Sequence, residues 1–217
     1  MMRLEDTYRH KGLRKRLVDT LINKGISQKQ VLRAILKVPR HIFMDTAFVE
    51  HAYEDKAFGI GEGQTISQPY TVAFQTELLD VTPGEKILEI GTGSGYQSSV
   101  LMEIGCNLYT IEYNKVLFER AKRLLNRMGY KAHFICGDGT KGFLSAAPYD
   151  KILVTAGAPD IPVPLLKQLK VGGKLVIPVG DTKHQKMLRI TKIEEDKFEK
   201  REFGDFSFVK LLGESGW

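Results

Sequence analysis

Apolar positions recur at helical spacing in the first forty residues. They form two runs: Leu13, Leu17 and Leu21, followed by Val31, Ile35 and Val38. Because such spacing places side chains on one helix face, we expect two leader helices, the second ending at Pro39. Ser27 has the residue type and the position of an N-cap for the second helix. Residues 40–66 show no clear period, so we expect loop with short elements there.

The stretch GQTISQPYTVAFQTELL, residues 63–79, joins a short polar run to a helix. Its second half repeats at i, i+4 and i+7 from Val72, and Pro69 suits the first helical turn. Ser67 lies in the polar run, without a histidine or an acid nearby in sequence to activate it. Two interpretations remain open: Ser67 caps the helix, or it faces a substrate.

From residue 86 onward, short apolar runs alternate with helical segments. Strands are expected at 86–91, 107–113, 132–139, 149–157 and 173–180, and helices at 96–105, 115–129 and 163–170. Residues 186–204 alternate like a hairpin, and 205–212 read as a final strand. This order predicts an α/β fold: a doubly wound, mostly parallel sheet with helices on both faces and antiparallel C-terminal edge strands.

Composition places the chain among ordinary globular proteins, with 42% hydrophobic and 27% charged residues in 217. No apolar run approaches the roughly 20 residues of a membrane span, and the charged start lacks the apolar core of a signal peptide. The two cysteines, Cys106 and Cys136, lack metal-type spacing, and we expect reduced, buried thiols. We therefore expect a cytoplasmic protein without membrane contact.

The net charge of +6 raises the question of nucleic acid as a partner. Residues 1–40 carry 11 Lys and Arg against 3 Asp and Glu, whereas the other 177 residues carry 21 against 23. The basic charge is thus confined to the leader, where a solvated helix face is its commoner meaning. We do not expect nucleic acid as a partner.

Candidate chemistry gathers where the first three strands end. In such sheets ligands bind beyond the carboxyl ends of the strands. The first strand runs into the glycine-rich turn 91–95, preceded by Glu89; the second ends at Glu112, and the third at Asp138 between two glycines. Glu112 is placed to accept hydrogen bonds from ribose hydroxyls, and Asp138 from an adenine amino group.

A ligand with a ribose, an adenine and a positive charge matches these three acids, which indicates S-adenosylmethionine. NAD(P) is the alternative. However, the dinucleotide-binding motif G-x-G-x-x-G requires a glycine at the position of Tyr96, and Glu89 would repel a pyrophosphate. Tyr96 and Gln97, at the start of the next helix, are candidates for cofactor contact or for local packing. Residues 155–159 (TAGAP) follow the fourth strand and are expected on the floor of the site.

The motifs LEIGTGSGYQ, TIEY, GDG, YDKILVTAGAP and GGKLVIPVG resemble those of class I methyltransferases. The stretch GQTISQPYTVAFQTELL is more specific. Together with VPRHIFM and FVKLL, it resembles the bacterial protein-L-isoaspartate O-methyltransferases, in one collinear order over residues 30–212.

The resemblance implies methyl transfer from S-adenosylmethionine to the free carboxylate of L-isoaspartyl residues in damaged proteins, which leads through a succinimide to aspartate. It implies Ser67 as the catalytic residue, with Ser67, Val209 and Leu212 at the substrate. The implied cofactor contacts are Gln64, Thr65, Ile66, Ser67, Glu89, Ile90, Gly91, Thr92, Gly93, Gly95, Glu112, Asp138 and Gly139. Residues 1–62 would form a helical leader packed on a cofactor-binding catalytic domain, 63–217, in one compact unit.

Two alternatives remain at this stage. One is an RNA or small-molecule methyltransferase that uses the same cofactor, and the other is a non-catalytic module that keeps the cofactor pocket. No metal is expected, since the five histidines show no ligand spacing. The expected partners are isoaspartyl proteins and peptides, the expected product of the cofactor is S-adenosylhomocysteine, and the expected state is a monomer.

Overall fold

The computed structural model describes residues 5–217; positions 1–4 of the predicted leader lie outside the described residues. The two leader helices are confirmed as α1 (Tyr8–Asn23) and α2 (Lys29–Lys37).

The N-cap of α2 is Gln28, so the prediction of Ser27 as the cap is wrong. Both the amide and the hydroxyl of Ser27 donate to Glu77 Oε1, at 2.9 and 2.8 Å. Ser27 therefore ties the leader to another helix instead of capping its own.

The segment expected as loop with short elements holds two 3₁₀ helices, η1 (Arg40–Phe43) and η2 (Thr46–His51), and a small hairpin. The hairpin strands β1 (Phe58–Gly61) and β2 (Gln64–Ile66) pair antiparallel, and α3 (Pro69–Leu79) follows. Pro69 occupies the first turn of α3, where its missing N–H costs no hydrogen bond.

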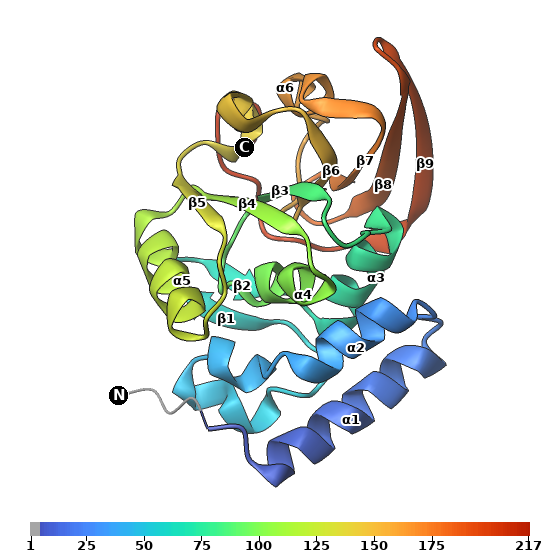
Figure 1. Cartoon of the computed structure of the whole chain (residues 1–217). Helices are drawn as coiled ribbons and strands as arrows, with labels where there is room; N and C mark the ends of the chain where they lie inside the picture. Colours follow the sequence, from blue (N-terminus) through green and yellow to red (C-terminus); the bar gives the residue numbers. More distant parts are fainter. Residues whose placement is uncertain (1–4) are drawn as a thin grey trace.

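The central sheet has seven strands in the order β5-β4-β3-β6-β7-β8-β9. Strands β3 to β7 run parallel, and β8 is antiparallel to both of its neighbours, which confirms the predicted class (Figure 1). The strands are β3 (Lys86–Ile90), β4 (Asn107–Glu112), β5 (His133–Cys136), β6 (Tyr149–Val154), β7 (Leu169–Gly180), β8 (Gln185–Glu194) and β9 (Lys197–Phe206). The helices between them are α4 (Tyr96–Ile104), α5 (Lys115–Arg127), η3 (Gly139–Lys141), η4 (Leu144–Ala146) and α6 (Val163–Lys167).

The predicted final strand at 205–212 is correct only at its start. Strand β9 ends at Phe206, and Lys210 forms only an isolated bridge with Gly157. The amide of Phe208 donates to the side chain of Gln185 (2.8 Å), and the amide of Leu211 to the Gly157 carbonyl (2.8 Å). The chain thus leaves the sheet edge and crosses to the segment that follows β6.

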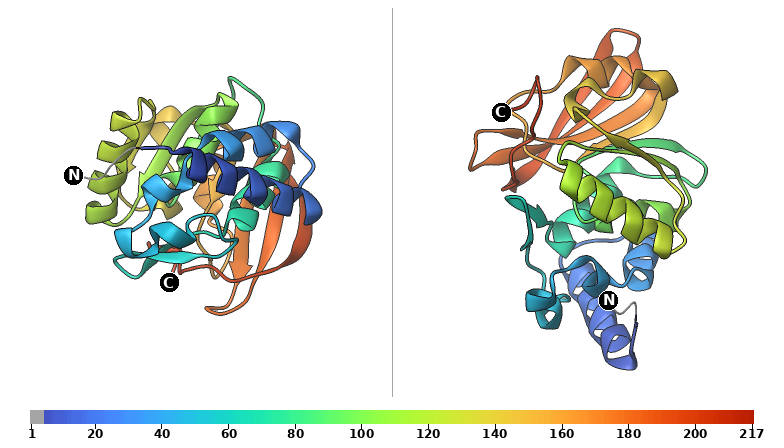
Figure 2. Two further views of the ribbon diagram at one scale, coloured as in Figure 1. Left: turned by 90° about the horizontal axis from the view of Figure 1, so that it is seen from below. Right: turned by 90° about the vertical axis from the view of Figure 1, so that its left-hand side faces the viewer.

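Helices cover both faces of the sheet, as a mostly parallel sheet requires. Helices α3, α4 and α5 pack on one face, and α6 with η3 covers the other. The leader helices lie outside this layer, against α3 and α4 (Figures 1 and 2). None of the helices in residues 5–217 has the length and apolar character needed to cross a bilayer.

Asp55 connects the leader to the start of α3. Its Oδ2 lies 2.6 Å from Lys24 Nζ beyond α1, and its Oδ1 accepts from the amide of Tyr70 at 2.7 Å. Tyr70 is the second residue of α3, so its amide is one of the four that no helical carbonyl can satisfy. A carboxylate 15 positions earlier in the chain therefore takes the place of a local cap.

We expect Asp55→Ala to lower the free energy of unfolding by about 1–2 kcal/mol, the usual cost of losing a helix cap. Urea denaturation measures the change. Lys24→Met is the matched control, because it leaves the Asp55 cap in place and removes a partly exposed ion pair together with the cation–π contact of Lys24 with the Tyr70 ring, and it is expected to cost less than about 1 kcal/mol. Equal unfolding free energies for Asp55→Ala and the parent would contradict the capping role.

Candidate active site at the carboxyl ends of the strands

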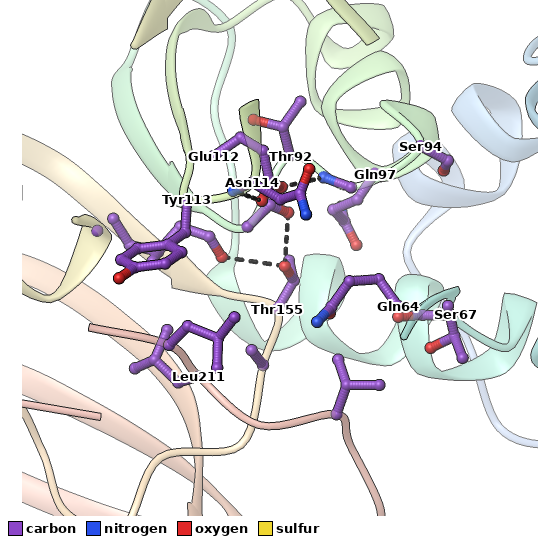
Figure 3. A pocket seen from close by; sticks show the side chains of 18 of the residues that line it. Gln64, Ser67, Thr92, Ser94, Gln97, Glu112, Tyr113, Asn114, Thr155 and Leu211 are labelled. Carbon is purple, nitrogen blue, oxygen red and sulfur yellow. Dashed lines mark hydrogen bonds between the residues drawn. The ribbon is translucent and has the colours of Figure 1, made fainter. Parts of the chain in front are cut away.

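A cavity opens where β3, β4 and β6 end, as expected for an open α/β sheet. It has about 770 Å³ of unfilled space when its mouth and the adjoining open solvent are included. The predicted residues that line it are Gln64, Thr65, Ile66, Ser67, Ile90, Gly91, Thr92, Gly93, Glu112, Gly139, Val209 and Leu212. Figure 3 shows several of them around one space. The structure thus brings together residues that lie up to 148 positions apart in sequence.

The turn after β3 gives the cavity a backbone wall. Gly91 and Gly93 have φ values of +95° and +53°, which residues with a Cβ adopt at a cost. A Cβ on Gly91 would lie 2.5 Å from Thr155 Oγ1. The Thr155 hydroxyl lies within hydrogen-bond distance of the carbonyls of Ile90 (3.0 Å) and Gly91 (2.7 Å) and so braces the turn. A glycine at 91 is therefore required by both conformation and close approach.

Glu112, the last residue of β4, lies in the middle of the cavity wall. Its Oε2 accepts from the amide of Gly93 (2.8 Å) and its Oε1 from the amide of Asn114 (2.9 Å). It is only 6% exposed, and Figure 3 shows it between Tyr113 and Thr92. Two backbone donors hold the carboxylate in place, and each oxygen retains a lone pair for a hydroxyl group.

Glu89 is fully buried and does not line the cavity. Its Oε2 accepts from the hydroxyls of Ser98 and Thr110, and Thr110 Oγ1 lies 2.6 Å from Thr92 Oγ1. Glu89 therefore supports the glycine turn indirectly, through the hydrogen bonds that link it to Thr110 and Thr110 to Thr92. The pKa of Glu89 is raised from 4.5 to about 7, chiefly because burial disfavours the charged form; the two hydroxyl donors oppose this shift, and the nearby Glu112 adds to it.

The raised pKa of Glu89 makes the stability of the fold depend on pH. Between the ordinary pKa of 4.5 and about 7, the folded protein binds a proton that the unfolded chain releases. The stabilisation is thus complete below the lower value and is lost as the pH rises through the higher one. We expect Glu89→Gln to abolish this loss, which amounts to about 3 kcal/mol in order of magnitude.

Urea denaturation at pH 5 and pH 7.5 tests this expectation, with Glu119→Gln on the exposed face of α5 as the control. The control should keep the pH dependence of the parent. Parallel pH profiles for Glu89→Gln and the parent would show that Glu89 is ionised throughout.

Two further predicted cofactor residues also lie outside the cavity lining, Gly95 and Asp138. Gly95, at φ +86°, closes the turn as the N-cap of α4. Asp138 caps η3, accepting from the amide of Thr140 (2.9 Å), and its other oxygen accepts from the amide of Glu214 (2.9 Å). Direct cofactor contact stays a prediction for both, as it does for Glu89.

Ser67 lies between β2 and α3 and lines the cavity. The N-cap of α3 is Gln68, without a side-chain hydrogen bond, and the amide of Tyr70 is taken by Asp55. The Ser67 hydroxyl has no hydrogen-bond partner in the described part of the chain. The cap interpretation of Ser67 is therefore wrong, and its hydroxyl is available to a ligand.

Several lining residues were not among the predicted contacts: Val72, Ser94, Ile111, Tyr113, Asn114, Thr155, Ala156, Lys210 and Leu211, besides the undecided Tyr96 and Gln97. Thr155 and Ala156 do come from the TAGAP stretch expected on the floor. Lys210 and Leu211 reach the cavity because the Gly157 backbone holds their segment, accepting from the amide of Leu211 and donating to the carbonyl of Val209. Backbone hydrogen bonds between segments so far apart in the sequence cannot be recognised from the local sequence.

One group of possible metal ligands occurs among residues 5–217, formed by Asp6, His10 and His41, with their atoms within 4.8 Å of one another. Arg14 already binds both Asp6 oxygens, at 3.0 and 2.8 Å. One ring nitrogen of His41 lies 2.7 Å from the Tyr53 hydroxyl, and the other 3.1 Å from a backbone carbonyl. A metal ion there would displace these bonds and face the Arg14 charge, and none of the three residues lines the cavity.

Comparison with known proteins shows a family likeness over nearly the whole chain. The family model described as protein-L-isoaspartate(D-aspartate) O-methyltransferase matches residues 12–216. A protein-L-isoaspartate O-methyltransferase of Cytophaga hutchinsonii is 63% identical over 214 residues, covering 99% of this chain and 97% of its own. One from Flavobacterium psychrophilum is 56% identical over 210 residues, covering 96% and 98%.

Solved structures share the fold. A protein-L-isoaspartate O-methyltransferase with 30% identity superposes with a TM-score of 0.85, covering 94% of this chain and 67% of that one. A structure from Plasmodium falciparum, titled as a putative protein-L-isoaspartate O-methyltransferase in complex with S-adenosyl-L-homocysteine, is 24% identical, with a TM-score of 0.79, and covers 92% and 98%. At that identity the second likeness concerns the fold alone.

Proposed function

Because the chain belongs to the protein-L-isoaspartate(D-aspartate) O-methyltransferase family, we propose that it methylates the free carboxylate of L-isoaspartyl residues in damaged proteins and peptides. The methyl ester collapses to a succinimide, whose hydrolysis restores some normal aspartate. The proposal rests on one observation: the same cavity is lined by the Glu112 carboxylate and by the Ser67 hydroxyl, which has no hydrogen-bond partner within residues 5–217.

The cavity fits S-adenosylmethionine as the cofactor. Glu112 offers an acceptor to each of two ribose hydroxyls, and the glycine turn from Gly91 lets the backbone approach a ligand closely. Gly139 and Tyr113 also line the cavity and would face the adenine. When bound, the cofactor supplies a methyl group on a positively charged sulfonium, a good leaving group. We propose no metal in this reaction.

Ser67 orients the substrate and does not act as a base. A carboxylate has a reference pKa near 4, so at neutral pH it is already a nucleophile. The Ser67 hydroxyl donates a hydrogen bond to one carboxylate oxygen and leaves the other free to attack. The complete alignment of two reactants can supply on the order of 7–11 kcal/mol of the barrier reduction, and the Ser67 hydrogen bond would contribute one part of it. Val209 and Leu212 line the same cavity and would pack against the apolar part of the substrate.

The proposal includes a monomeric, cytoplasmic enzyme with a leader (1–62) packed on a catalytic domain (63–217). The packing of the leader is supported by the contacts of α1 and α2 with α3 and α4, and the cytoplasmic location by the free state of Cys106 and Cys136. Cys136 is exposed and Cys106 half-buried, so the prediction that both thiols are buried is wrong. Light scattering at micromolar concentration tests the monomer. A mass of twice 24.5 kDa would contradict it.

One assay separates this function from the alternatives. Labelled S-adenosylmethionine is offered with an isoaspartyl peptide, with its aspartyl twin and with bulk RNA. We expect base-labile label on the isoaspartyl peptide alone. Label on RNA would favour the nucleic-acid alternative, and absence of label on every substrate, with cofactor bound, would favour the non-catalytic module.

A further inference from the structure

Gln97 is a buried side chain on the cavity wall. It is the second residue of α4, follows the glycine turn directly and is only 8% exposed. It lines the cavity on the side of Gln64 and Ser67, whereas Tyr113 and Glu112 lie toward the other end (Figure 3). The residues that would face the ribose and the adenine are thus separated from Gln97.

A chain of hydrogen bonds determines which way the Gln97 amide points. The Thr76 hydroxyl lies 2.7 Å from the Val72 carbonyl, which can only accept, so Thr76 donates its single proton there. Thr76 Oγ1 is then an acceptor for Gln97, and the group 3.0 Å away must be the Nε2 donor. Gln97 Oε1 therefore points away from α3.

Gln97 Oε1 is buried, and among the described residues it has no hydrogen-bond partner. A buried amide oxygen without a donor costs about 1–3 kcal/mol. The reverse amide orientation would not remove this cost, because Nε2 would then lose its acceptor. An oxygen left in this state on a cavity wall indicates a donor group on the ligand.

We propose that Gln97 Oε1 accepts a hydrogen bond from the α-ammonium group of the methyl donor, an inference that rests on the proposed function. The substrate carboxylate carries no proton at neutral pH and cannot be the donor. The adenine amino group belongs to the other end of the cavity, near Tyr113. Within the amino-acid part of the methyl donor, the α-ammonium group is the one that carries protons at neutral pH, and a neutral carbonyl oxygen is a suitable partner for it, since a charged donor gives a strong hydrogen bond.

Ligand truncation tests the assignment without any turnover. S-adenosylhomocysteine carries the ammonium group, whereas 5′-methylthioadenosine keeps the adenine, ribose and sulfur and lacks the amino-acid part. By calorimetry, we expect Gln97→Leu to raise the Kd of S-adenosylhomocysteine about 10- to 100-fold. The Kd of methylthioadenosine should change less than about twofold, since no hydrogen bond to it is lost.

Gln75→Leu is the matched control. Gln75 is an equally buried glutamine on α3 whose Nε2 donates to the Val154 carbonyl (3.0 Å), and it does not line the cavity. We expect it to lower stability and leave both ligand affinities unchanged. Gln97→Met, an unbranched apolar replacement, repeats the measurement if Gln97→Leu does not fold.

The outcomes distinguish this inference from the proposed function. An unchanged affinity of the Gln97 variants for S-adenosylhomocysteine would overturn the inference alone. Equal weakening of both ligands would also overturn it, because it would indicate a general packing role. Failure of the parent protein to bind S-adenosylhomocysteine would overturn the proposed function itself.

Discussion

Replacing Glu112 by alanine is expected to weaken the binding of S-adenosylhomocysteine about 100-fold. A hydrogen bond to a charged group contributes about 1.5–3 kcal/mol, and the carboxylate offers one acceptor to each ribose hydroxyl. The same oxygens hold the amides of Gly93 and Asn114, so the variant also loses the support of the glycine turn. Among the described residues that line the cavity, no other side chain carries a carboxylate that could replace Glu112.

Calorimetry of the purified variant measures the effect. Glu112→Gln should lose less than Glu112→Ala, since its amide keeps one acceptor oxygen, but it brings an N–H group against a backbone amide. Glu119 is an exposed acid on α5 that does not line the cavity, so Glu119→Ala should bind as the parent does. An unchanged Kd for Glu112→Ala would refute the ribose role.

The fold class could be predicted because the central sheet is encoded locally. In the strands at 86–90 and 149–154, neighbouring residues such as Ile87 and Leu88, or Ile152, Leu153 and Val154, are buried on both faces of the sheet, so apolar residues follow one another without alternation. Helix α5 was recognisable by the strong periodicity of Leu117, Leu124 and Leu125 against charged neighbours. These signals depend only on the residues of the element itself.

The failures share one physical cause, which is a partner distant in sequence. Ser27 has the chemistry of a cap but is bound by Glu77, 50 positions away, and the α3 amide is bound by Asp55 rather than by Ser67. The final strand ends early because Gln185 and Gly157 take the amides that would continue the ladder. Side-chain chemistry alone does not reveal which of two available partners binds.

The candidate site was predictable at the strand ends and less so elsewhere. Glu112 and the glycine turn lie where topology requires, and both line the cavity. Glu89 and Asp138 are also acids at comparable positions, yet two hydroxyls of the protein donate to Glu89 Oε2 and backbone amides donate to both oxygens of Asp138. Residue type and strand end indicate a candidate, whereas the direction of the side chain depends on tertiary neighbours.

Ser67→Ala is expected to lower kcat about 100-fold, which is within the range for removing one hydrogen bond to a charged group. The Ser67 hydroxyl would contact the substrate carboxylate, so the Kd for S-adenosylhomocysteine should stay within about threefold of the parent. Single-turnover methylation of an isoaspartyl peptide at saturating cofactor measures the rate. Ser94→Ala is the matched control, because Ser94 also lines the cavity and its hydroxyl already accepts from the amide of Tyr96.

Thermal denaturation decides between the two roles of Ser67 that the sequence left open. A cap would contribute about 1 kcal/mol, and its loss would lower the Tm by several degrees. Because Asp55 binds the α3 amide, the Ser67→Ala variant should melt with the parent, whereas Asp55→Ala should melt earlier. A lowered Tm together with an unchanged rate would contradict the structure on both counts. An unchanged Tm together with a lowered rate would place the whole effect of Ser67 on the substrate carboxylate.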